Sequence, residues 1–127
     1  MKIALSLLSG LVLAAAGAGP SLAADKGTCF RMSQMQGHTI ADASTLYVGV
    51  GGTRDVYRVA MSGACLAGKT SSDPLITRGF GGSDLICKPI DLDLAVGGPG
   101  GPSHCIVSSI TKLAPAELAA LPKKLKP

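Results

Sequence analysis

The sequence has few aromatic side chains and no tryptophan: its 127 residues include two phenylalanines and two tyrosines. Proteins that bind single-stranded nucleic acid stack the bases on aromatic side chains along a basic groove. Proteins that bind a duplex need a dense surface of Lys and Arg. Of the twelve basic residues, three sit together at the C-terminus, as Lys123, Lys124 and Lys126, and eight residues are acidic. We therefore expect no nucleic acid among the partners.

The sequence also lacks any close pair of cysteines. Its four cysteines, Cys29, Cys65, Cys87 and Cys105, are separated by intervals of 36, 22 and 18 residues. A zinc ribbon, a thioredoxin-type redox pair and a c-type haem site each need two cysteines only a few residues apart. The spacing excludes these three kinds of site, and we expect neither a metal nor a cofactor.

Catalytic and nucleotide-binding motifs are missing as well. There is no Gly-x-Ser-x-Gly elbow, and the histidines are His38 and His104. The glycines of Gly49–Arg54 lack the spacing of a dinucleotide loop, and Gly97–Pro102 lacks the Lys-Ser/Thr of a phosphate loop. His38 lies four residues before Asp42, a spacing that suits a catalytic or metal pair on a helix, but its polar surroundings favour a solvated histidine in a loop. These absences predict a protein that is not an enzyme.

The N-terminus carries the one long apolar segment. Met1–Ala23 begins with the charged Lys2, continues as an apolar run and ends in Ser21-Leu22-Ala23. A charged start, an apolar centre and small residues at the exit are the features of a secretory signal peptide. We predict cleavage after Ala23, which leaves Ala24–Pro127 as a single domain of 104 residues. Because Lys2 is lost, eleven basic and eight acidic residues remain, a net charge of +3.

The predicted signal peptide sets the compartment, and the compartment decides whether the cysteines form disulfides. No cysteine directly follows the apolar segment, so a lipid anchor is not expected, and no later segment is long and apolar enough to span a membrane. We expect a periplasmic or secreted protein, soluble after cleavage. In an oxidising compartment the even number of cysteines predicts two disulfides. Three pairings are open. We favour Cys65–Cys87 with Cys29–Cys105, because each pair would tie segments that flank the expected hairpin and the last strand.

The clearest local structure is a hairpin. Residues 45–50 and 54–61 both alternate between apolar and polar side chains, and Gly51-Gly52 lies between them. A Gly-Gly loop can adopt the positive φ angles of a tight turn. With residues 51 and 52 as the loop, residue 50 faces residue 53 and one face becomes apolar. That face carries Leu46, Val48, Val50, Tyr57, Val59 and Met61.

Further short strands are expected at 29–32, 40–42, 75–78, 85–96 and 104–113, with loops at 33–39, 79–83 and 97–102. Pro89 predicts a bulge or a sheet edge within 85–96. Pro115 begins a helix of about two turns that Pro122 ends, and residues 123–127 form a loose tail. The pattern predicts a mostly β domain, a small antiparallel sheet or partly open barrel of five to six strands, with a short C-terminal helix and two disulfides.

Acidic residues near the last two strands are the remaining candidates for chemistry. On a strand, Asp91 and Asp93 would project to one side about 7 Å apart. Two carboxylates at this spacing could hold a cation or divide acid and base roles, and Asp84 and His104 could extend the group. The other interpretation, which we favour, is the solvated face of an amphipathic strand.

Several short motifs accompany the cysteines. They are Cys29-Phe30-Arg31, Thr45-Leu46-Tyr47-Val48 after Asp42, Tyr57-Arg58-Val59 before Cys65-Leu66, Ser83-Asp84-Leu85-Ile86-Cys87 and Cys105-Ile106-Val107. In this combination, from about Cys29 to Leu118, the chain resembles a family of small exported proteobacterial proteins with four cysteines and no assigned function. Lys88-Pro89-Ile90-Asp91 departs from the family pattern, which has Gly-Asp followed by a strand. The resemblance implies an exported β domain and brings no catalytic residue.

These observations predict a non-catalytic binding or envelope-associated module. Its partner would be an unknown protein or a cell-envelope glycan, bound through a sheet face or through the loops Gly79–Ser83 and Gly97–Pro102. The alternative is a small hydrolase or metal-dependent enzyme that uses Asp84, Asp91, Asp93 and His104.

Overall fold

The structure is a computed structural model that describes residues 29–52 and 54–127. The predicted signal peptide, Met1–Ala23, and its cleavage site lie outside the described residues. In the described part of the chain, no helix is long and apolar enough to cross a bilayer.

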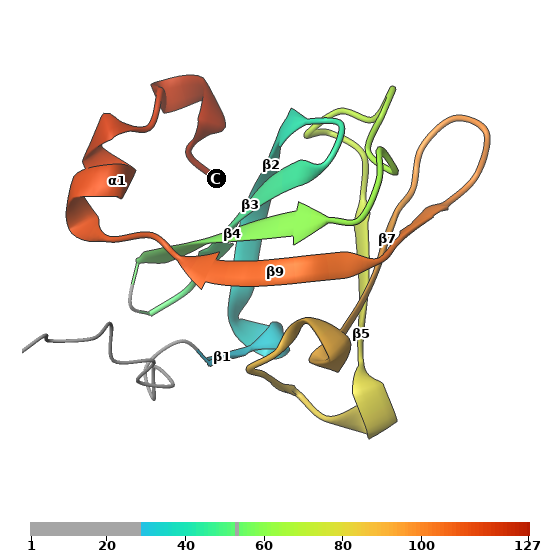
Figure 1. Cartoon of the computed structure of the whole chain (residues 1–127), viewed down its shortest axis with the longest axis horizontal. Helices are drawn as coiled ribbons and strands as arrows, with labels where there is room; N and C mark the ends of the chain where they lie inside the picture. Colours follow the sequence, from blue (N-terminus) through green and yellow to red (C-terminus); the bar gives the residue numbers. More distant parts are fainter. Residues whose placement is uncertain (1–28, 53) are drawn as a thin grey trace, which may run out of the picture.

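The described chain forms nine short strands, all paired antiparallel (Figure 1). The strands are β1 (Phe30–Arg31), β2 (Met35–Asp42), β3 (Thr45–Val50), β4 (Asp55–Met61), β5 (Leu75–Gly79), β6 (Leu85–Ile86), β7 (Leu92–Val96), β8 (Ser103–Cys105) and β9 (Val107–Lys112). The helical segments are α1 (Pro115–Ala120) and four 3-10 turns, η1 (Met32–Gln34), η2 (Phe80–Gly82), η3 (Pro89–Asp91) and η4 (Lys123–Leu125).

The strands form a four-stranded sheet in the order β2-β3-β4-β9, a three-stranded sheet in the order β5-β7-β8, and the pair β1-β6. β8 and β9 follow one another with Ile106 between them, so one extended segment passes from one sheet into the other. Buried side chains from both sheets meet in a single core. The predicted mostly β, antiparallel and partly open architecture, with its short C-terminal helix and two disulfides, is confirmed.

The strands outnumber the five or six expected because two predicted strands are each divided. The predicted strand over residues 85–96 is interrupted by η3, which Pro89 begins, so this proline starts a turn and marks neither a bulge nor an edge. The predicted strand over 104–113 is divided at Ile106. The helix at Pro115 is confirmed. The tail is not loose, because it forms η4 and contacts β2.

The β3–β4 hairpin has the predicted faces and a longer loop. Val50 pairs with Asp55, so four residues, 51–54, connect the strands where two were predicted. Gly51 is not available to a two-residue turn, because its N–H donates to the Gln34 carbonyl at 2.7 Å. The register moves by two residues, and a shift by an even number leaves every side chain on its predicted face. All six residues of the predicted apolar face are buried.

The segment 33–39 was predicted as a loop, and this prediction is wrong. β2 begins at Met35 and pairs with β3 from there to Asp42. It is an edge strand with a register irregularity between Met35 and His38, where Gly37 has a φ of 71°. Most residues of β2 are at least partly exposed, and its sequence lacks the alternation of apolar and polar residues from which a strand is predicted.

The favoured disulfide pairing is wrong. The structure pairs Cys29 with Cys87 and Cys65 with Cys105, and it leaves none of the four cysteines free. The cause is the β1–β6 pairing, in which Phe30 faces Ile86 and Arg31 faces Leu85, so that the next position outward places Cys29 opposite Cys87. Cys65 lies in the turn after β4, which approaches β8 because Ser62 N–H donates to the Ile106 carbonyl at 2.8 Å.

Candidate binding surface

The outer face of the β5-β7-β8 sheet brings several candidate side chains together. Arg78 is paired with Asp93 and Ile76 with Ala95, and Ala95 also lies opposite His104. Side chains alternate between the two faces of a sheet, so these residues share one face, and Leu94 and Val96 occupy the buried opposite face. Together with Pro102, the outer-face residues line a hollow of about 160 Å³.

A second, larger hollow adjoins the first at Asp93, which lines both. It has a volume of about 390 Å³ and is formed by η2, η3 and the β8–β9 junction. Three large apolar side chains at its margin are mostly exposed: Phe80 at 71 %, Ile90 at 70 % and Ile106 at 74 %. Because water gains access to these three side chains, their burial by a partner would be favourable.

We refer to the two hollows and their margins as the Phe80 surface, defined by Ile76, Arg78, Phe80, Ile90, Asp93, His104 and Ile106. Four of the five large apolar side chains that are exposed in the described part of the chain lie on it, and Leu85 is the fifth. Single exposed apolar residues are ordinary, whereas a contiguous group of this kind is a candidate for an interaction site.

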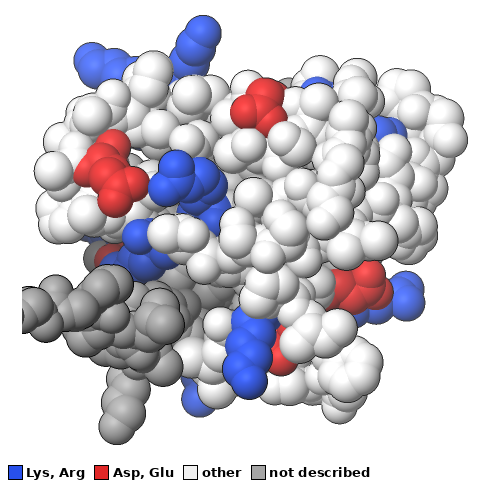
Figure 2. Space-filling model, viewed as in Figure 1, with Lys and Arg blue, Asp and Glu red and all other residues white. Residues whose placement is uncertain are grey.

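Charged side chains elsewhere are dispersed. Figure 2 shows Lys, Arg, Asp and Glu scattered singly or in small groups over one side of the molecule, with much uncharged surface between them. Three ion pairs of the described residues, such as Arg58–Glu117 at 3.3 Å, join side chains that are partly exposed. This face carries no continuous basic stripe of the kind that a nucleic acid would need.

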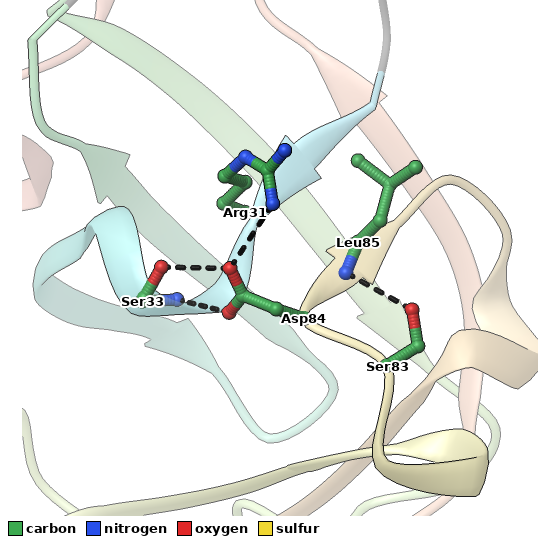
Figure 3. A network of polar contacts seen from close by, with 5 residues as sticks. All are labelled: Arg31, Ser33, Ser83, Asp84 and Leu85. Carbon is green, nitrogen blue, oxygen red and sulfur yellow. Dashed lines mark hydrogen bonds and ion pairs between the residues drawn. The ribbon is translucent and has the colours of Figure 1, made fainter.

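Asp84, one of the sequence candidates, has a structural role away from the Phe80 surface (Figure 3). Its carboxylate accepts hydrogen bonds from Ser33 N–H at 2.7 Å and from Ser33 Oγ at 2.8 Å, and Arg31 lies 3.7 Å away. The Ser33 hydroxyl and backbone N–H hold the pKa of Asp84 below its usual value, with a smaller contribution from Arg31. The contacts fasten η1 to the segment that precedes β6.

Asp91 also serves local structure. The expectation that Asp91 and Asp93 share one side of a strand is wrong, because Asp91 ends the η3 turn and Asp93 lies in β7. The Asp91 carboxylate accepts hydrogen bonds from Cys87 N–H at 2.9 Å and Lys88 N–H at 2.8 Å. These two N–H groups hold the pKa of Asp91 below its usual value. Of the four acidic and histidine candidates, Asp93 and His104 line a common hollow.

The histidine spacing noted in the sequence produces no pair. His38 Nε2 lies 3.0 Å from the Asp73 carbonyl, which connects β2 to the segment before β5. Asp42 instead accepts from Ser44 N–H at 2.9 Å, the contact that lowers its pKa most. His38 lies in β2 and is partly buried, so the prediction of a solvated histidine in a loop is wrong, whereas His104 is exposed. No group of three His, Cys, Asp or Glu side chains in the described residues is arranged to hold a metal ion.

Phe80 lies in the segment Gly79–Ser83, which was predicted as a binding loop, whereas the exposure of Ile90 and Ile106 was not foreseen from the sequence. Ile90 was read as one of the alternating apolar residues of a strand, and Ile106 as part of the last strand. Both lie where the expected strand is interrupted, so they point outward. Comparison of the chain with models of protein families, with curated proteins and with solved structures finds no match.

Proposed function

We propose that the protein is a non-catalytic binding module of an oxidising compartment outside the cytoplasm, and that it docks onto a partner through the Phe80 surface. The observation that carries the proposal is the gathering of Phe80, Ile90 and Ile106, each at least 70 % exposed, around one hollow. An exposed apolar group of this kind is unfavourable in water unless a partner covers it.

The compartment follows from the signal-like segment Met1–Ala23 and from the two disulfides. Disulfides persist in secreted and periplasmic proteins and are rare where thiols are kept reduced. The resemblance to exported four-cysteine proteins agrees with this assignment and also carries no catalytic role. These features support a location in the periplasm or outside the cell.

The chemistry of the surface favours a protein over an envelope glycan. Its exposed apolar side chains are three isoleucines and one aromatic ring, Phe80. Protein interfaces combine an apolar centre with a polar rim, and here Arg78, Asp93 and His104 supply the polar groups. The expected partner is thus a protein with an apolar patch and both signs of charge.

The proposal is tested by capture of partners from an envelope extract with the tagged, oxidised protein. We expect Ile106→Asp and Phe80→Asp to abolish the capture. Leu85→Asp is the matched control, because Leu85 is 46 % exposed and lies outside both hollows. If Leu85→Asp removed the partner and the two surface variants retained it, the assignment of the surface would be wrong.

A further inference from the structure

The Phe80 surface has a charge arrangement that is complementary to itself. Arg78 and Asp93 lie directly opposite one another on neighbouring strands of one face, and both side chains are exposed. No ion pair or hydrogen bond within the described part of the chain engages either charge. A partner that offers a carboxylate to Arg78 and a cation to Asp93 at the same spacing would therefore pair with both charges.

We propose that this partner is a second copy of the chain, packed face to face about a two-fold axis that runs between Arg78 and Asp93, parallel to β5 and β7. This inference rests on the proposed function, because it uses the same surface. Rotation about such an axis exchanges the two positions, so each Arg78 faces the other copy's carboxylate and each Asp93 faces the other copy's guanidinium. A two-fold interface requires this reciprocity.

The same axis also brings Ile76 of each copy to the hollow over Ala95 of the other copy. Ile76 is the register partner of Ala95, so the rotation that exchanges Arg78 with Asp93 places Ile76 of each copy over Ala95 of the other. Ile76 is 38 % exposed, and Ala95 is a small residue in the hollow of about 160 Å³. The protruding Ile76 side chain of each copy therefore faces the open hollow over Ala95 of the other copy.

The apolar part of the surface meets its own equivalent. β5 ends at Gly79 and leads into η2, while η3 leads into β7, so Phe80 and Ile90 lie at one end of the two antiparallel strands. An axis parallel to the strands keeps that end over the corresponding end of the other copy. Apolar residues then cover apolar residues, and the two charge pairs lie nearer the middle.

The size of the surface agrees with a dimer interface. The exposed fractions of the four apolar side chains, at roughly 150–200 Å² for a whole side chain of this size, amount to an area on the order of 450 Å². A standard interface buries about 800 Å² on each partner. The apolar side chains supply about half of this area, and the exposed side chains of Arg78, Asp93 and His104 add to it.

The test is sedimentation equilibrium of the oxidised chain, from which any signal has been removed, over a range of concentrations at low salt. We expect twice the monomer mass at the higher concentrations. Arg78→Asp and Asp93→Arg should each weaken the dimer by about tenfold or more, because each places like charges opposite one another at two symmetric positions. The double variant R78D/D93R should restore dimerisation. Lys123→Asp, on η4, is the control for a simple change of net charge.

A chain that remains a monomer at every concentration would overturn the inference. So would a dimer that the single substitutions leave intact, or one that the double substitution fails to restore. Far-UV circular dichroism confirms that each variant is folded, and both substituted positions are exposed. A monomer that still loses a captured protein on Ile106→Asp would leave the proposed function in place, so the two failures are distinguishable.

Discussion

Removal of the Cys65–Cys105 disulfide should cost about 4 kcal/mol of the free energy of unfolding. The bond closes a loop with a sequence separation of 40 residues. In the chain-entropy treatment, a loop of this length loses about 13 cal/mol/K in the unfolded state, which is about 4 kcal/mol at 25 °C. The variant Cys65→Ala with Cys105→Ala is preferable to serine, because Cys105 is buried and a hydroxyl group there would add a desolvation cost.

The expected value is measured by urea unfolding of the double-alanine variant and of the oxidised wild type. Tryptophan is absent, so the signal is far-UV circular dichroism together with the fluorescence of the two tyrosines. With a slope of about 2 kcal/mol/M, a loss of about 4 kcal/mol moves the urea midpoint down by roughly 2 M. The slope itself should rise, because the denatured chain without the cross-link exposes more surface.

The other disulfide provides a matched comparison. Cys29–Cys87 has a sequence separation of 58 residues, and the longer loop raises the expected cost by only about 0.3 kcal/mol. Two double-alanine variants with nearly equal losses would agree with the entropic argument. If the Cys65–Cys105 variant unfolded at the wild-type midpoint, the reasoning that this bond restricts the unfolded chain would be refuted.

Two further predictions rest on the structure and a third on the sequence. The pKa values of Asp84 and Asp91 are lower in the folded protein than in the unfolded chain. Their contribution to stability is therefore present above the unfolded pKa of about 3.9 and is lost as the pH falls through the folded pKa values. The double variant D84N/D91N should lose less thermal stability than the wild type between pH 6 and pH 3. Leu94→Ala should cost about 3 kcal/mol in urea unfolding, since Leu94 is fully buried, and a cost below about 1 kcal/mol would contradict its place in the core. Mass spectrometry of the exported protein should find Ala24 at the N-terminus, and a chain that retains Met1 would contradict the signal peptide.

Peptide mapping can verify the connectivity directly, provided that the cleavage is chosen with care. Lys88 precedes Pro89, a bond that trypsin leaves intact, so a tryptic digest keeps Cys87 and Cys105 on one peptide. Additional cleavage before Asp91 and Asp93 separates them. The digest should then contain one disulfide-linked peptide pair that joins Cys29 with Cys87, and a different pair for the second bond.

The sequence predicted what depends on side-chain alternation and missed what depends on distant contacts. The apolar face of the β3–β4 hairpin was predicted correctly although its loop length was not, because a two-residue error in register leaves the faces unchanged. The disulfides depend on β1 and β6, strands of two residues each, which are too short to have a periodic pattern. Their pairing therefore has no local signal.

The candidate surface was missed in part, for a related reason. Asp93, His104 and the loop that carries Phe80 were identified from the sequence, but Ile90 and Ile106 were assigned to strand interiors. Whether Ile90 and Ile106 are buried depends on where η3 and the β8–β9 junction interrupt the strands. That position follows from how the two sheets meet, which is a property of the tertiary structure and not of any one segment.

The β8–β9 junction also bears on the entropy of binding. Ile106 follows the disulfide-bonded Cys105, and its carbonyl is held by Ser62 N–H at 2.8 Å, so the backbone beneath this exposed side chain is fixed from two directions. A partner that covers Ile106 immobilises few additional degrees of freedom, and ordering of loops and side chains is one of the main costs of association. This preorganisation allows a small surface to bind with an affinity that a mobile loop of the same composition would not reach.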